Sequence, residues 1–370
     1  MHRGVREFVR WLEDNRGQPD VNLSKPATSR ELDGMEQQLG GPLPTDLRHI
    51  LTRFNGGALP SGTLLPAGLG PGTIEAEVRR FAEEVGADFL DPELFLPFHR
   101  TLEGSLLCFD RSAGPVSDTW PIVDYDEDTG DIRVVHRTFD GWCAYCVAQW
   151  SAPDFREDFN LDKYLRTGAR HVAVEPDVAS AHATVAHAFK RAGNPELALD
   201  SYLQAARCVP SLPWCDWEAL KLAVLLDKMP EALEAAGRLC GRAPGERWAL
   251  RETTPGAVAD LAGRMAVSGR DDSPWVRLLD QLIEQAEGEE REHAVEVRRC
   301  VVVGEPLPAV KQPRQSLAPA ASDPEQWWRA LEQAYHAGHL REDDLLFDPQ
   351  LQRVAEYRPL ADLLRIRRDF

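Results

Sequence analysis

The chain of 370 residues is long enough for two domains. Its 60 acidic residues outnumber its 42 lysines and arginines, so the net charge is −18. Residues 1–170 contribute −10 of this charge (28 acids, 18 bases), and residues 171–370 contribute −8 (32 acids, 24 bases). Acidity spread over the whole chain supports solubility, repels nucleic-acid phosphates and favours a basic protein partner. No apolar run approaches the roughly 20 residues of a membrane span, and the first residues lack the apolar core of a secretory signal. We therefore expect a cytoplasmic protein that binds neither nucleic acid nor a membrane.

Three amphipathic helices are predicted in the first 57 residues. The N-terminal helix places Val5, Phe8, Val9 and Leu12 on one face. In the second, Thr28 and Glu31 have the spacing of a capping box, and Gly40, Gly41 and Pro42 end the helix. The apolar positions at helical spacing are Leu32, Met35 and Leu39 in the second helix and Leu47, Ile50, Leu51 and Phe54 in the third.

Short strands separated by turn residues follow, at the close spacing of an antiparallel sheet. The candidate strands are residues 62–65, 94–96, 105–110, 120–125 and 131–136. A helix over residues 74–86 interrupts them, with Ile74, Val78, Phe81 and Val85 facing inward. A last helix, from about Phe139 to Trp150, closes this part of the chain.

The order of these elements resembles the SUKH superfamily over residues 1–165. The residues that carry the resemblance are Leu43-Pro44, Asn55-Gly56-Gly57, Leu96-Pro97-Phe98, Cys108-Phe109-Asp110 and Thr138-Phe139. The resemblance implies an α+β domain in which helices pack on a mostly antiparallel sheet. It also implies a function, because bacterial members of the superfamily are mostly immunity proteins against secreted toxins.

Pro44, Asn55, Gly56 and Gly57 are interpreted as structural residues. Glycine adopts backbone angles that other residues avoid, and asparagine tolerates a left-handed conformation and bonds its own backbone. Direct contact of these residues with a ligand is the alternative.

Five acidic residues gather within residues 124–131: Asp124, Asp126, Glu127, Asp128 and Asp131. A calcium loop would need glycine at its sixth position and glutamate at its twelfth, where Thr129 and Val135 stand. The run is therefore predicted to be a hairpin turn. As an exposed acidic turn it is our candidate contact for a basic protein partner, and reversing Asp126, Glu127 and Asp128 to lysine should weaken that contact.

The seven cysteines are scattered and odd in number, as expected of reduced thiols in a cytoplasmic protein. Cys143 and Cys146 form the one CxxC motif, inside a predicted helix and without a second pair for zinc. Core packing is the favoured interpretation, and metal or redox chemistry is the alternative. No metal site and no cofactor is predicted.

From about residue 172 the sequence becomes rich in alanine and leucine and shows no strand pattern. Residues 179–210 resemble a tetratricopeptide repeat, a pair of helices whose small residues allow close approach. The matching positions are Ala186, Phe189, Gly193, Ala198, Tyr202, Ala205 and Pro210. A weaker copy places Ala232 34 residues after Ala198, which is the period of the repeat. A degenerate third pair is predicted within residues 256–287.

The predicted organisation has four parts. They are a SUKH-like α+β domain (1–165), an all-α domain of tetratricopeptide-like repeats (172–302), a Pro/Ala-rich linker (303–324) and terminal capping helices (325–370). The last part begins a helix near Trp327 and continues through Leu351, Val354, Leu360, Leu363 and Leu364.

Three classes of function remain open at this stage. The first is a bacterial cytoplasmic immunity protein that occludes a toxin stoichiometrically. The second is an adaptor or regulatory scaffold that recruits client proteins through its repeats. The third is an enzyme, which we do not expect because no P-loop, nucleotide-binding glycine cluster or nucleophile elbow is present.

Overall fold

The computed structural model describes residues 1–68, 70–84, 94–114, 119–127, 130, 132–241, 255–266, 273–308, 323–348, 351, 354 and 357–368. The chain divides into two compact units. The N-terminal unit comprises Met1–Phe159 and Arg166–Ala181, and the C-terminal unit comprises Asn160–Leu165 and His182–Phe370. Each unit is described by itself below.

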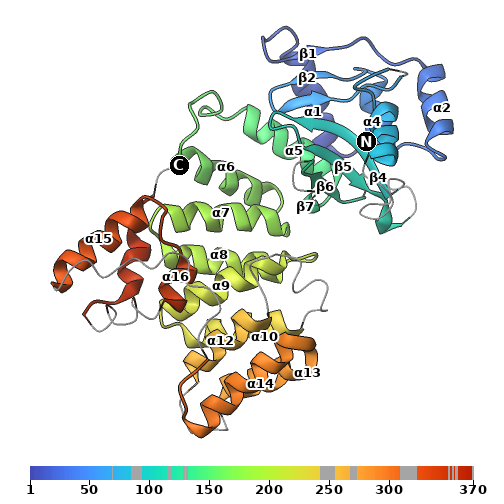
Figure 1. Ribbon diagram of the computed structural model, residues 1–370. Helices are drawn as coiled ribbons and strands as arrows, with labels where there is room; N and C mark the ends of the chain where they lie inside the picture. Colours follow the sequence, from blue (N-terminus) through green and yellow to red (C-terminus); the bar gives the residue numbers. More distant parts are fainter. Residues whose placement is uncertain are drawn as a thin grey trace. The chain divides into compact units, whose positions relative to one another are not determined.

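The N-terminal unit is built on one antiparallel sheet of seven strands in the order β1-β2-β3-β4-β5-β6-β7 (Figure 1). Its strands are β1 (Asn22–Leu23), β2 (Gly57–Leu59), β3 (Gly62–Leu64), β4 (Phe95–Thr101), β5 (Leu106–Asp110), β6 (Ile122–Tyr125) and β7 (Ile132–His136). Every strand pairs with the next one in sequence, as expected for closely spaced strands. The predicted antiparallel sheet is confirmed, and β1 and β2 are additional strands that the sequence did not indicate.

Close approach of two backbones explains why glycine occupies position 57. Gly57 pairs with Leu23 of β1 and with Leu64 of β3, and its φ is 132°. A Cβ at this position would lie 2.2 Å from the carbonyl oxygen of Asn22. A side chain here would therefore push β1 away from the sheet.

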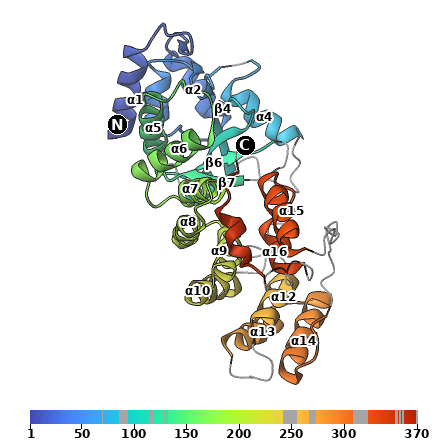
Figure 2. The same ribbon diagram turned by 90° about the vertical axis from the view of Figure 1, so that its left-hand side faces the viewer.

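The helices described up to residue 159 are α1 (Arg3–Asp14), α2 (Ser29–Gln38), α3 (Thr45–Leu51), α4 (Ile74–Glu84) and α5 (Phe139–Trp150). A capping box between Thr28 and Glu31 starts α2, and Thr138 caps α5 through the backbone N–H of Gly141. Both α1 and α3 pack against α5, while α4 packs against β4 (Figure 2).

The core of the N-terminal unit is aromatic where α1 and α5 meet the sheet. The Phe98 ring of β4 lies 5.0 Å from the Trp142 ring and 5.2 Å from the Phe139 ring, both on α5. Phe8 of α1 contacts Trp142 from the other side, at 5.2 Å. These four side chains are at most 2% exposed. Burial of such large apolar rings supplies much of the driving force for folding.

After α5 the described residues form helices and the turns that join them. The described ones are α6 (Leu161–Val174), α7 (Ala179–Arg191), α8 (Pro195–Arg207), α9 (Pro213–Leu225), α10 (Met229–Gly241), α12 (Pro255–Met265), α13 (Pro274–Gln285), α14 (Gly288–Val303), α15 (Pro324–His336) and α16 (Glu342–Phe347). Short turns join α7 to α8 and α9 to α10. Ala198 and Ala232 occupy corresponding positions in α8 and α10, and both are fully buried. The helical C-terminal region is confirmed, and its assignment as tetratricopeptide-like stays a prediction.

The C-terminal segment after residue 323 packs along the first helix of each pair. Phe347 stacks on Trp217 of α9, and Arg264 of α12 donates to the carbonyl oxygens of Leu346 and Phe347. Lys190 of α7 lies 3.4 Å from the carboxylate of Glu342. Figures 1 and 2 both show α16 beside α9. The predicted linker falls largely on residues 309–322, which lie outside the described residues.

Among the residues that the structure describes, none of the helices combines the length and the apolar character needed to cross a membrane.

Candidate functional site

The acidic turn predicted to bind a partner lies in the hairpin between β6 and β7. Asp124 is 8% exposed and accepts a hydrogen bond of 2.7 Å from Arg133. Glu127 forms ion pairs with Arg80 of α4 and Arg100 of β4. Two of the five carboxylates are therefore already neutralised within the unit. Asp126 is partly exposed, while Asp128 and Asp131 lie outside the described residues.

The residues interpreted as structural lie at turns and close contacts. The side chain of Asn55 donates to the carbonyl oxygen of Ala67 (2.9 Å) and accepts from its N–H (2.7 Å). This differs from the expected bond to its own backbone. Pro44 precedes α3 at its N-cap position. A Cβ on Gly56 would lie 2.6 Å from the carbonyl oxygen of Leu64.

In the C-terminal unit, Gly193 lies at a close backbone contact in the turn between α7 and α8. Its φ is 76°, and a Cβ there would lie 2.4 Å from the carbonyl oxygen of Arg365. The backbone at Arg365 therefore packs directly on this turn.

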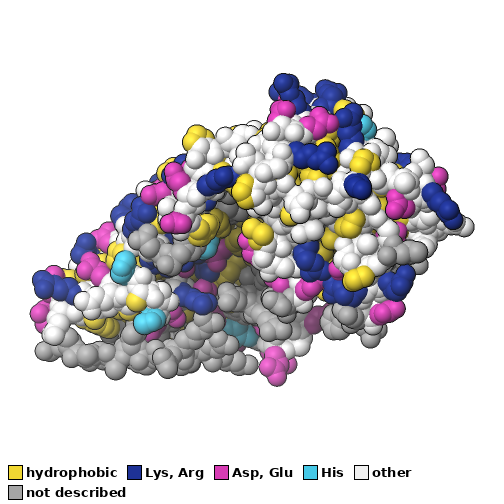
Figure 3. All heavy atoms as spheres, turned by 90° about the horizontal axis from the view of Figure 1, so that it is seen from above, with side chains coloured by type: hydrophobic (Ala, Val, Ile, Leu, Met, Phe, Trp, Pro, Cys, Tyr) yellow, Lys and Arg dark blue, Asp and Glu magenta, His cyan; other side chains and the backbone are white. Residues whose placement is uncertain are grey.

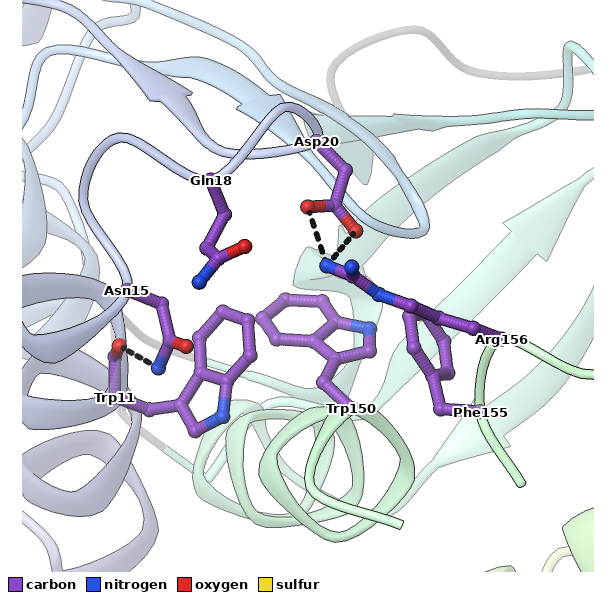
Figure 4. Close-up of a pocket in the computed structure, with 7 residues that line it drawn as sticks. All are labelled: Trp11, Asn15, Gln18, Asp20, Trp150, Phe155 and Arg156. Carbon is purple, nitrogen blue, oxygen red and sulfur yellow. Dashed lines mark hydrogen bonds and ion pairs between the residues drawn. The ribbon is translucent and has the colours of Figure 1, made fainter. Parts of the chain in front are cut away.

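A pocket of about 230 Å³ opens at the surface of the N-terminal unit (Figure 4). Its lining residues are Trp11, Asn15, Gln18, Asp20, Trp150, Phe155 and Arg156. The indoles of Trp11 and Trp150 form its floor, with ring centroids 4.8 Å apart. Arg156 donates to the Asp20 carboxylate at 3.2 Å across its rim. Aromatic and arginine side chains around a small pocket are typical of the anchor points of protein interfaces.

The sequence did not predict this pocket, because its two halves are about 130 residues apart in the chain. Trp11 belongs to the last turns of α1 and Trp150 is the last residue of α5, and the other lining residues follow these two helices. They meet only because α1 and α5 pack side by side. On the face seen in Figure 3, lysines and arginines are interspersed with acidic residues.

A group of three ionisable side chains lies buried in the N-terminal unit. His136 ends β7, and His171 and Glu175 are one helical turn apart at the end of α6. The Oε2 atom of Glu175 is 2.5 Å from Nδ1 of His136 and 3.3 Å from Nε2 of His171. The three residues are 5%, 9% and 8% exposed. The sequence analysis missed this group, although the four-residue step from His171 to Glu175 was a usable signal.

The electrostatics of this group follow from burial and from the shared carboxylate. Burial lowers the pKa of His136, and the hydrogen bond to Glu175 opposes this shift. For Glu175, burial disfavours the charged form, but the hydrogen bonds from both imidazoles outweigh burial and lower its pKa to about 2. Glu175 is therefore an anion at neutral pH.

The CxxC cysteines lie in α5, and both are buried. Burial raises the pKa of each thiol well above its usual range. A protonated, inaccessible thiol is a poor nucleophile and a poor metal ligand. The structure therefore places Cys143 and Cys146 in the core.

The comparison with protein families finds a match within the N-terminal unit. Residues 26–144, which are 119 of the 370 residues, match the model of the SMI1 / KNR4 family (SUKH-1). The chain carries a SUKH-1 domain. This domain spans α2 to the first part of α5 and includes all strands except β1. No curated protein is similar enough to the chain to be counted as a relative.

The candidate sites differ in whether they lie inside the residues that match SUKH-1. The acidic turn and the Asn55 to Ala67 contact lie inside the matched residues, whereas every residue that lines the pocket lies outside them. His136 is inside the match, and His171 and Glu175 follow it. The pocket therefore lies wholly outside the matched residues, and the buried group lies partly inside them.

Proposed function

We propose that this protein is a cytoplasmic immunity protein that neutralises a secreted bacterial toxin by stoichiometric binding. The SUKH-1 domain carries the proposal, because this family is known for toxin-immunity proteins and supports a protein-binding role. In this proposal the protein is not an enzyme: it covers the toxin's functional surface and performs no chemistry on it.

The proposed anchor for the toxin is the pocket between Trp11 and Trp150. Trp11 is partly exposed, whereas Trp150 beneath it is 7% exposed. A partly exposed aromatic side chain on a rigid support offers a partner a large apolar contact area. The acidic turn around Asp126 is proposed as a second contact that attracts a basic toxin surface and speeds the encounter. Because Glu127 is already paired with two arginines, the test of this turn should leave Glu127 unchanged.

Co-expression with a toxin encoded beside this gene tests the function. The intact protein should restore growth, and the purified pair should form a complex of one chain each. Trp11→Ala should weaken the complex about 30-fold or more, as expected for a loss of about 2 kcal/mol at an aromatic anchor. Tyr357→Ala is the matched control, since Tyr357 is an aromatic residue of the other unit that is 50% exposed. Absence of protection against every neighbouring toxin would exclude the proposal.

A separate variant tests whether the acidic turn contacts the toxin. Asp126→Lys combined with Asp128→Lys should slow association and make it less dependent on salt. A double reversal of Glu289 and Glu290, two acids in the first turn of α14, is the control for net charge. An association rate that falls equally in both variants would assign the effect to overall charge and remove the turn from the interface.

The helix pairs of the C-terminal unit support a second candidate, an adaptor or scaffold that recruits client proteins. Its support is the 34-residue spacing of Ala198 and Ala232, which are both fully buried at corresponding positions. Tetratricopeptide-like arrays generally offer extended binding surfaces. Capture of several endogenous clients by the full chain, combined with no protection against toxins, would favour this function over immunity.

A further inference from the structure

We propose that His136, His171 and Glu175 form a binding site for a divalent transition-metal ion, for which Zn²⁺ is the best fit. The proposal rests on the convergence of three ligand atoms, on their chemistry and on the space that the surrounding residues leave for them. It concerns the N-terminal unit alone and does not depend on the partner of this protein.

Convergence is the first observation. One nitrogen from each imidazole and one carboxylate oxygen lie within 4.8 Å of one another. They come from two separated segments, the end of β7 and the end of α6. In a tetrahedral site with ligand bonds of 2.0 to 2.1 Å, two ligand atoms are about 3.3 Å apart. The distance from His171 Nε2 to Glu175 Oε2 is 3.3 Å, and the His136 ring would need to retreat from Glu175 by about 0.8 Å.

The donor set is the second observation. Two imidazole nitrogens and one carboxylate oxygen suit zinc and neighbouring transition metals, whereas calcium and magnesium prefer oxygen ligands alone. Both histidines bind a metal in their neutral form, with the proton on the other ring nitrogen. A divalent ion would also balance the buried negative charge of Glu175.

The surroundings are the third observation, because they orient Glu175. The backbone N–H of Arg137 donates to its other oxygen, Oε1, at 2.8 Å. Gly141 leaves the space for this carboxylate: a Cβ there would lie 2.0 Å from Oε1. Such outer hydrogen bonds fix the orientation of metal ligands.

Tyr145 of α5 encloses the group. Its ring lies 5.2 Å from the ring of His136 and 4.5 Å from that of His171. An aromatic ring beside the group lowers the local dielectric constant and so strengthens the interaction of the ligands with an ion. Three protein ligands leave a fourth position for water, so the site differs from a closed structural site with four protein ligands.

The expected consequence of metal binding is a link between β7 and α6. These elements are 35 residues apart at His136 and His171, and the ion would hold the end of α6 on the sheet. An ion that binds only the folded state adds stability that increases with its concentration. The N-terminal unit should therefore unfold at a higher temperature when zinc is present.

The test uses the full-length protein, freed of metals with a chelator and dialysed. Titration with Zn²⁺ in a calorimeter and with Co²⁺ in an absorption spectrometer should each give one ion per chain. The Co²⁺ complex should show visible bands of nitrogen and oxygen ligation and lack a near-ultraviolet thiolate band. His171→Ala and Glu175→Gln should each weaken binding about 100-fold or more. His339→Gln, which changes an exposed histidine, should bind as the unaltered protein does.

Three results would overturn the proposal. The first is no uptake of either ion by the unaltered protein at micromolar concentrations. The second is uptake that the His171 and Glu175 variants retain. The third is a thiolate band, which would assign the ion to cysteines. If a variant fails to fold, X-ray absorption of the zinc complex of the unaltered protein tests the ligand set directly. It distinguishes a first shell of nitrogen and oxygen ligands from one that contains sulfur.

Discussion

The ammonium group of Lys221 on α9 lies 2.9 Å from the carboxylate of Asp343 on α16, although 122 residues separate the two in sequence. Lys221 is 2% exposed and also pairs with Glu218 at 2.7 Å. Burial opposes its charge, but Glu218 and Asp343 together raise its pKa. The helical array and the C-terminal segment of the unit are therefore joined by a buried ion-pair network as well as by apolar packing.

Removing Lys221 should destabilise the C-terminal unit strongly. Lys221→Ala leaves the buried Glu218 with Lys190 as its remaining partner among the ion pairs of this network. Breaking a buried pair by removing one partner costs about 3 kcal/mol. Urea unfolding of the full chain measures this cost. Lys228→Ala, an exposed lysine that follows α9, should change stability by less than about 0.5 kcal/mol. Equal effects of the two substitutions would contradict the structural role of the network.

The glycine at the start of β2 offers a second test. Gly57→Ala introduces a Cβ that meets the Asn22 carbonyl oxygen at 2.2 Å, at a φ of 132°. We expect a loss of about 2 kcal/mol or more, because β1 must detach or the backbone must strain. The control is Gly34→Ala inside α2, where a Cβ meets nothing within 4 Å. That substitution should stabilise the protein by up to about 1 kcal/mol. Thermal unfolding compares the two variants.

The elements that could be predicted from the sequence are those fixed by local patterns. The capping box at Thr28, the strands β3 to β7 and the helix that starts at Phe139 all follow from residue spacing. The two residues of β1 are too few for an alternating pattern, and β2 begins inside the Asn55-Gly56-Gly57 motif, which is typical of a turn. They exist because Gly57 lets their backbones approach.

The candidate sites were less predictable, since long-range packing assembles them. Trp11 and Trp150 meet through the contact of α1 with α5, and no local pattern encodes that contact. The sequence indicated the acidic turn correctly as a hairpin. It did not reveal that Arg80 and Arg100, which are 47 and 27 residues from Glu127, approach that carboxylate.

Thiol reactivity should follow burial. Six of the seven cysteines are buried, and Cys208 is the half-buried exception. Burial raises the pKa of Cys108, Cys143 and Cys146 well above their usual range. In the native protein a disulfide reagent should therefore modify one thiol rapidly, and Cys208→Ser should abolish this phase. All seven should react in urea. Rapid modification of Cys143 or Cys146 in the folded protein would contradict this prediction and would support a redox role for the CxxC motif.

Stability below pH 7 should depend on His99 of β4. Its side chain is 1% exposed, contacts the Ser61 carbonyl oxygen through Nε2 and lies against Trp142. Burial lowers its pKa from 6.5 to about 4. Because the unfolded chain binds this proton more readily, the contribution of His99 is present above pH 6.5 and is lost as the pH falls toward 4. Between pH 7 and pH 5 the unaltered protein should lose about 2 kcal/mol more than His99→Gln, which cannot titrate. Urea unfolding at pH 7 and pH 5 measures the loss of stability in each protein. Equal losses of stability in the two proteins would show that His99 does not stay neutral in the folded state.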